Sequence, residues 1–279
     1  MAFSVNTNAG AMAALQSLNA TNNKMETTQS RINTGLAVSS TKDDSAKYTI
    51  AQTLRGDLGG LNAVSSSLSN AKSVTDTAIA GAEQISDILN QMKSKAYEAA
   101  DAGLEDDSRA AIDKDFTALK EQITTIIESS EFNNTNLLDS TFTGTTSVAA
   151  LQSLKVATGT DTLDVANQAF DTSVDTAIGT GGINTQATAE TMVGTLDTVI
   201  ADVNTSLSDL GAASRKIDGQ LSFTSKLSDV VTTGIGNLVD ADLAKESANL
   251  QALQVQQQLG VQALSIANQA PQTILSLFR

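Results

Sequence analysis

The feature that most constrains this chain is an apolar seam whose members alternate in steps of four and three residues. The seam runs from Ile50 to Ala99 with two polar interruptions, Asp57 and Thr75. Seven heptads without a change of register are typical of a helix that packs along its length against another helix. Proline breaks helix interiors and occurs once in 279 residues. The sequence therefore predicts one very long helix here, with the glycines at 56, 59 and 60 as the place where it could bend or split.

A second long seam occupies the other half of the chain. It runs from Val193 to Leu238, slips by one residue near Gly234 and Gly236, and continues over residues 239–278. A shorter seam precedes the first one and consists of Leu15, Leu18, Asn22, Met25, Gln29, Ile32 and Leu36. Helices far apart in the chain must bury their seams, and pairing of the two ends does so most economically. The predicted fold is mainly α, an elongated antiparallel helical bundle or coiled coil formed by the N- and C-terminal parts.

The centre of the chain, residues 141–187, has no long seam and is dense in Thr, Gly and Asp. Two short stretches, residues 153–157 and 162–165, flank a turn and predict a small β-hairpin. We expect this central segment to be exposed at the surface.

Helix starts are marked by acidic residues. Residues 41–44 (TKDD) resemble a capping box for the long helix, and Ser108 is expected to cap the next one, with Asp106 and Asp107 complementing its dipole. The pairs Asp43–Asp44 and Asp106–Asp107 lack the spacing of a calcium loop, so capping and solvation are favoured over a metal site.

The charge is unevenly distributed. The formal net charge of −14 lies between residues 41 and 234, which hold 13 basic and 27 acidic residues, whereas the two ends are almost neutral. This indicates a solvated middle and ends that pack against other protein surfaces. Acidity argues against nucleic acid as a partner, and no apolar run reaches the ~18 residues that span a bilayer. Without Cys or His, thiolate and imidazole chemistry are excluded. We expect no enzyme activity, no cofactor and no metal.

Polar residues interrupt the terminal seams at Asn22, Gln29, Glu246 and Gln257. Two interpretations remain open. The seams are either a poorly optimised coiled coil, or marginal helices whose polar positions set the register when they pack among copies of the chain.

Both ends of the chain resemble bacterial flagellin. Residues 30–46 (SRINTGLAVSSTKDDSA) are similar to the family's N-terminal signature, whose core reads SGLRINSAKDDAA, and residues 267–279 (ANQAPQTILSLFR) resemble the family ending ANQxPQxxLSLLR. Residues 131–134 (EFNN) and 210–215 (LGAASR) match landmarks in the middle. The resemblance covers about 1–140 and 190–279, whereas the centre matches nothing that can be named.

The resemblance implies a structural subunit that polymerises into the flagellar filament for swimming, in a compact form without large outer domains. Residues 1–40 and 240–279 would form an inner coiled-coil layer, residues 41–140 and 188–239 a long-helix layer, and residues 141–187 a variable surface segment. The implied partners are further copies or related flagellins, an export chaperone, the type III export apparatus, the filament cap and the hook-junction proteins. The implied location is the extracellular filament.

The expected polymerisation interface lies in the terminal seams. Its residues are Leu15, Leu18, Met25, Ile32, Leu36, Leu250, Leu253, Leu264, Ile274 and Leu277. The alternative function is a junction protein between hook and filament, which shares the terminal layers. An enzyme that uses carboxylates is the third possibility, but no spacing in the sequence predicts a pocket with convergent acids.

Overall fold

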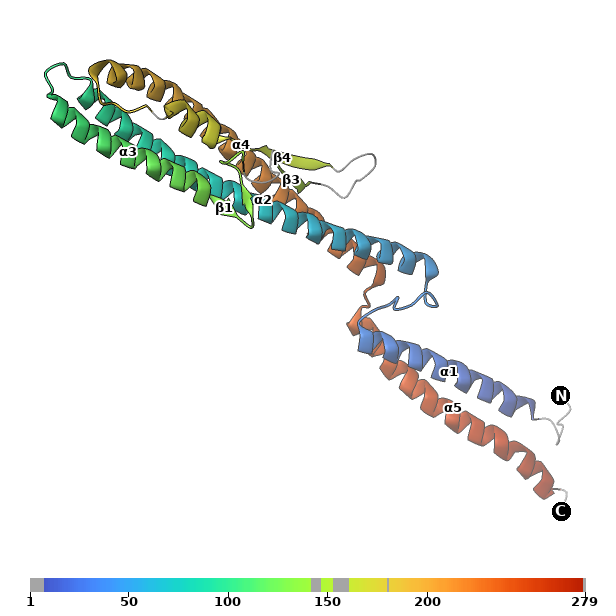
Figure 1. Cartoon of the computed structure of the whole chain (residues 1–279). Coiled ribbons are helices and arrows are strands. Elements are labelled where there is room, and N and C mark those ends of the chain that lie inside the picture. Colours follow the sequence, from blue (N-terminus) through green and yellow to red (C-terminus); the bar gives the residue numbers. More distant parts are fainter. Residues whose placement is uncertain (1–7, 142–146, 153–160, 180, 278–279) are drawn as a thin grey trace. The chain divides into compact units, whose positions relative to one another are not determined.

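The computed structural model describes residues 8–141, 147–152, 161–179 and 181–277 (Figure 1), with side chains described as far as residue 269. The described part is mainly helical and contains two small antiparallel strand pairs, which confirms the predicted fold class. The helices are α1 (Ala9–Thr34), α2 (Ser45–Ala99), α3 (Asp106–Ser129), the π-helical turn η1 (Asp171–Thr176), α4 (Gln186–Val239) and α5 (Leu243–Leu277). The strands are β1 (Glu131–Phe132), β2 (Thr135–Asn136), β3 (Ser147–Leu151) and β4 (Thr162–Ala166).

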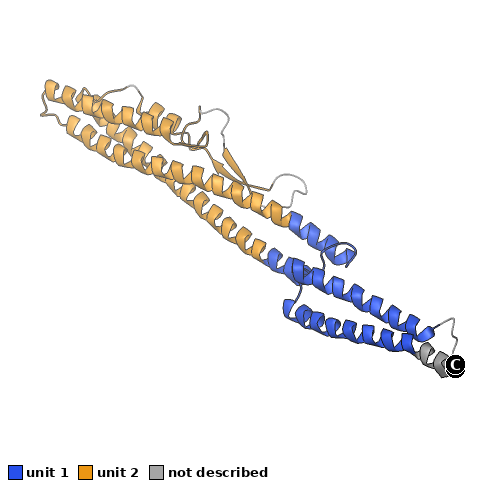
Figure 2. Ribbon diagram, turned by 90° about the horizontal axis from the view of Figure 1, so that it is seen from below, with its two compact units in different colours: residues 1–56, 230–279 blue, residues 57–229 orange. Residues whose placement is uncertain are grey.

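The chain divides into two compact units (Figure 2). Unit 1 contains residues 1–56 and 230–279, and unit 2 contains residues 57–229. Unit 1 carries seven basic and six acidic residues, a net charge of +1, whereas unit 2 carries 10 basic and 25 acidic residues, a net charge of −15. The division into three layers that the resemblance implies stays a prediction.

In unit 2 the long seam of α2 forms the centre of the core, and α3 and α4 lie beside it (Figure 1). The prediction is confirmed from Leu61 to Ala99, over which the seam residues are buried. Thr75 is fully buried, and its hydroxyl group is satisfied because it donates a hydrogen bond to the carbonyl oxygen of Ala71 (2.8 Å). Ile50, at the start of the predicted seam, is instead 51% exposed.

The α2 helix is continuous through the three glycines that the sequence marked as the place where it could bend or split. A glycine costs about 1 kcal/mol relative to alanine in a helix interior. Burial of the seam that begins at Leu61 and Val64 offsets this cost.

Two hairpins lie between α3 and η1. In the first, β1 and β2 are joined by Asn133 (φ 50°) and Asn134 (φ 61°), the positive pair that a two-residue type I′ turn needs. In the second, β4 pairs with β3, so the predicted strand over residues 162–165 is confirmed. The other predicted strand, residues 153–157, lies outside the described residues.

The central segment is not wholly a surface feature, contrary to expectation. Phe170, Val174 and Ile178 recur every four residues and are buried in the unit 2 core, as are Ala150 and Val165 on the inner face of the second hairpin. These short apolar stretches are too brief to show a seam in the sequence, and only their packing against the helices reveals them.

The helix starts differ in detail from the predictions. α2 begins at Ser45, and Asp44 rather than Thr41 caps it by accepting from the Lys47 amide (3.0 Å). α3 begins at Asp106, so Ser108 lies inside the helix, while both acidic residues occupy the first turn as expected. These aspartates therefore serve helix ends and solvation, as the sequence favoured.

Candidate functional site

The candidate site is the antiparallel pair of α1 and α5 in unit 1. Three polar contacts join the helices in a single register along their lengths. The Asn8 side-chain amide donates to the Ala267 carbonyl (2.6 Å), the Gln257 amide donates to the Asn22 side-chain oxygen (2.8 Å), and Arg31 forms an ion pair with Glu246 (3.2 Å). Three of the four polar seam positions, Asn22, Gln257 and Glu246, therefore pair across the interface.

The face of α5 that meets α1 is the one predicted. Its members alternate in steps of four and three, and each is buried or half-buried: Glu246, Leu250, Leu253, Gln257, Gly260, Leu264 and Ala267. The predicted slip near Gly234 and Gly236 does not break the helix, because α4 continues through both glycines to Val239; the helices separate at residues 240–242, before α5 starts at Leu243.

The face of α1 is rotated slightly from the predicted face along the length of the helix. The residues turned toward α5 are Ala11, Ala14, Leu18, Thr21, Met25, Thr28 and Ile32. Leu18, Met25 and Ile32 were expected, whereas Leu15 is 48% exposed and Gln29 is also exposed. Ala11 and Ala14 face α5 in place of the expected Leu15. The start of α1 is rich in alanine and has small apolar residues on several faces, so the spacing in the sequence does not identify which face is buried.

Leu36 was expected to extend the seam of α1, but that helix ends at Thr34 with Gly35 in the left-handed conformation (φ 72°). Leu36 then bridges to Asp240 and packs against a small core of Val38, Ala51 and Val239. For the remaining expected interface residues, Ile274 and Leu277, the side chains lie outside the described part.

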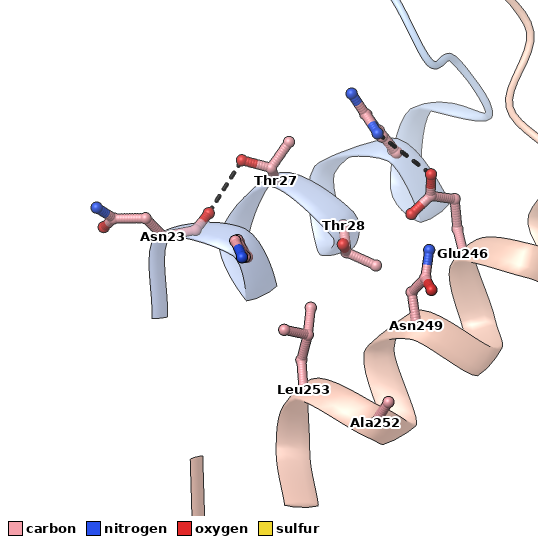
Figure 3. A pocket seen from close by; sticks show the side chains of 9 residues that line it. Asn23, Thr27, Thr28, Glu246, Asn249, Ala252 and Leu253 are labelled. Carbon is pink, nitrogen blue, oxygen red and sulfur yellow. Dashed lines mark hydrogen bonds and ion pairs between the residues drawn. The ribbon is translucent and has the colours of Figure 1, made fainter. Parts of the chain in front are cut away.

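A groove of about 460 Å³ opens along one side of the helix pair (Figure 3). The stick view shows Thr28 and Asn249 facing each other across it, with Glu246 at the end where Arg31 pairs with it. Glu246 is 9% exposed and therefore depends on that ion pair. The Nε atom of Arg31 is buried without a hydrogen-bond partner among the described residues.

A second apolar stripe lies on the side of α5 that faces away from α1, and the sequence analysis missed it. Val255 is 56% exposed, Leu259 58% and Ile266 69%. On α1, Met12 is 65% exposed. The signal was present in the sequence, because Val255, Leu259 and Ile266 recur at spacings of four and seven in a Gln-rich helix.

None of the helices in the described part of the chain combines the length and apolar character needed to cross a bilayer. No group of three or more carboxylates among the described residues is arranged to hold a metal ion.

Comparison with known proteins agrees with this geometry. The N-terminal helical region of bacterial flagellin matches residues 5–143, and its C-terminal helical region matches residues 193–278. Flagellin FljK of Caulobacter vibrioides is 43% identical over 276 residues, which cover 99% of this chain and 98% of that protein. A flagellin of Brucella melitensis is 38% identical over 283 residues and covers 99% of both chains.

Solved structures support the same fold. The crystal structure of Bacillus cereus flagellin aligns with a TM-score of 0.50 and 26% identity over 56% of this chain and 86% of that one. A putative flagellar hook-associated protein from Vibrio parahaemolyticus aligns with a TM-score of 0.57 over 71% of this chain and all of that one, but at 14% identity it shares the fold alone. No finding favours the hook–filament junction. The chain belongs to the bacterial flagellin family, a family of structural proteins, and is a subunit of the flagellar filament.

Proposed function

We propose that the α1–α5 pair is the part of the subunit that packs against neighbouring copies in the filament, and that residues 1–40 and 240–279 form its inner layer. The observation that carries the proposal is the second apolar stripe of α5. A helix that is apolar on two opposite faces is typical of a position buried on both sides. α1 covers one face, and a neighbouring copy would cover the other.

Burial of this stripe would contribute to the free energy of assembly. Complete burial of one Val, Leu or Ile side chain is worth about 1.5–3 kcal/mol. Val255, Leu259 and Ile266 are each more than half exposed in the single chain. Their burial in every copy would offset part of the entropy lost when a subunit joins the polymer.

The expected interface residues with described side chains then fall into three roles. Leu18, Met25, Ile32, Leu250, Leu253 and Leu264 line the seam within one subunit and would act by holding the helix pair together. Leu15 is exposed on α1 and would contact a neighbour directly. Leu36 would act through the small core beside Asp240. Ile274 and Leu277 remain predicted residues of the polymerisation interface on the basis of the sequence.

Family membership supports a proposal for the outer parts and for the partners. The strongly acidic unit 2 suits a solvated outer layer, since charge favours water over packing. A filament subunit would function outside the cell after passage through the type III export apparatus. It would meet an export chaperone, the filament cap and the hook-junction proteins on the way. No catalytic role is proposed.

The roles of the seam and of the outer stripe can be separated by experiment. Leu259→Asp would abolish seeded polymerisation while leaving the hydrogen-exchange protection of α1 and α5 in the monomer unchanged. Leu253→Asp places a charge in the seam and would reduce both. Leu259→Met is the matched control and would polymerise normally. Normal filaments from Leu259→Asp would show that the outer stripe is not the contact surface.

A further inference from the structure

The charges of the α1–α5 pair are few, and two of the three on α1 are unpaired. α1 carries Lys24, Glu26 and Arg31, of which Arg31 is paired with Glu246. Lys24 and Glu26 are both exposed, and the ion pairs among the described residues include neither. One positive and one negative charge therefore remain on a helix whose surroundings are otherwise almost uncharged.

Neither charge has an ion-pair partner among the described residues of its own subunit. Residues two apart on a helix do not face each other, and about 100° per residue places Lys24 and Glu26 roughly 200° apart around α1. The facing helix carries two charged side chains, Lys245 and Glu246, both in its first turn; Glu246 is paired with Arg31, and residues 247–277 contain no charged side chain. Lys24 and Glu26 thus lie on opposite sides of α1, and no described ion pair includes either of them.

Lys24 lines the groove between the helices, together with Asn23, Thr27 and Asn249. The Arg31–Glu246 ion pair also lines the groove, and the Arg31 Nε–H is buried without a hydrogen-bond partner among the described residues. In the single chain the groove therefore holds two cations and one carboxylate, an excess of one positive charge. A carboxylate, which only accepts, is the group that such a site fits.

We propose that the Glu26 carboxylate of one copy enters the groove of a neighbouring copy and pairs with its Lys24. This inference rests on the proposed packing of α1–α5 pairs in the filament. Packing would remove both charges from water, and a charge taken from water without a partner is costly. Each copy supplies one Lys24 and one Glu26 on opposite sides, so a head-to-tail contact between copies pairs every charge in a continuing polymer.

The test is a charge swap in the full chain, measured as the critical concentration for seeded polymerisation. Lys24→Glu and Glu26→Lys each leave two like charges near the contact and would raise the critical concentration on the order of tenfold, because an attraction becomes a repulsion. The double variant carrying both changes restores the opposite pair between copies and would return to within a few-fold of wild type. Lys245→Glu, a reversal outside the groove, is the matched control. Circular dichroism of each monomer verifies that helix content is unchanged.

The outcomes separate the two proposals. If Lys24→Glu and Glu26→Lys each polymerise at the wild-type critical concentration, the Lys24–Glu26 contact is overturned and the proposed packing of α1–α5 pairs stands. A double variant no better than the product of the two single effects would also overturn the contact. If the wild-type chain and the Leu259→Asp variant assemble equally well, both the packing proposal and the Lys24–Glu26 contact are overturned.

Discussion

Leu18 on α1 packs directly over Gly260 on α5: a Cβ atom on Gly260 would lie 3.2 Å from the Leu18 Cδ1 atom. The glycine leaves the space into which the leucine inserts, in the manner of a knob in a hole. This contact helps to explain why α1 presents Leu18 and the alanines before it to α5, and why Leu15 is left outside the seam.

Gly260→Leu should open the α1–α5 pair, because the larger side chain fills the space that Leu18 occupies. The expected result is reduced hydrogen-exchange protection in both helices and a higher critical concentration for polymerisation. Gln258→Leu, on the exposed side of the same helix, should leave protection unchanged. Adding Leu18→Ala to Gly260→Leu should recover part of the loss, and a double variant as weak as the single one would contradict the packing.

Replacing the Asn22–Gln257 contact by two leucines should strengthen the pair. The hydrogen bond of 2.8 Å contributes about 1 kcal/mol net, whereas two apolar side chains at these half-buried seam positions contribute more. We expect the free energy of opening, measured by hydrogen exchange in α1 and α5, to rise by about 1 kcal/mol. Either single replacement leaves one amide without its partner and should gain less. An unchanged double variant would show that the pair is not limited by its polar seam positions.

Gly81→Ala should destabilise unit 2. An added Cβ atom would lie 2.9 Å from the Leu138 Cδ1 atom and would also collide with the side chain of Ser130, so α2 would have to move away from the chain that follows α3. Overpacking of this kind costs about 1–3 kcal/mol, measured as the free energy of unfolding in urea. Gly194→Ala is the control: its Cβ meets nothing within 4 Å, so the better helix propensity should stabilise by about 0.5–1 kcal/mol. Equal effects at both positions would rule out the close approach at Gly81.

The loop between α1 and α2 should lose its order at low pH. The Oδ2 atom of Asp43 accepts hydrogen bonds from the backbone amides and hydroxyls of Ser39 and Ser40 at 2.9–3.1 Å. The backbone bond from Ser40 is the largest cause that lowers the pKa of Asp43 below its ordinary 3.8. A carboxyl with a lowered pKa stabilises the folded loop above the unfolded value, and this contribution is lost as pH falls through the folded value.

The check on this loop is an NMR titration. The Ser39 and Ser40 amides should keep their protection from pH 7 to pH 5 and lose it below about pH 3.8. Replacing both serines by alanine removes the hydroxyl donors and should raise the pKa of the Asp43 carboxyl. If that double variant titrates as the wild type does, the hydroxyl contacts contribute nothing.

Much of the helical architecture could be predicted from spacing alone. The α2 seam is buried from Leu61 onward, and the α5 seam is the predicted one through Ala267. Both predictions succeed because steps of four and three leave one face of a helix clearly more apolar than the others. The predicted face of α1 was partly wrong, because Met12 and Leu15 are apolar like Ala11 and Ala14, so the spacing does not favour one face over the other.

The candidate site was predictable only in part. The terminal helices and six of the seam residues were found from the sequence, but the outer stripe of α5 was hidden by the stronger seam on its other side. The groove beside Lys24 could not be seen either, since it depends on the register that Asn8, Asn22 and Arg31 set across the two helices.

The sequence by itself determined that the chain forms long, almost proline-free helices, that its middle is acidic and that its ends are nearly neutral. These properties follow from local backbone preference and from composition, which need no partner. Only the tertiary structure decided that Leu18 rather than Leu15 faces α5, that Ser147–Leu151 pairs with β4, and that Val255, Leu259 and Ile266 are left uncovered. The physical reason is that the choice between similar faces or strands depends on the shape and hydrogen bonds of the opposing segment, which lies far away in the chain.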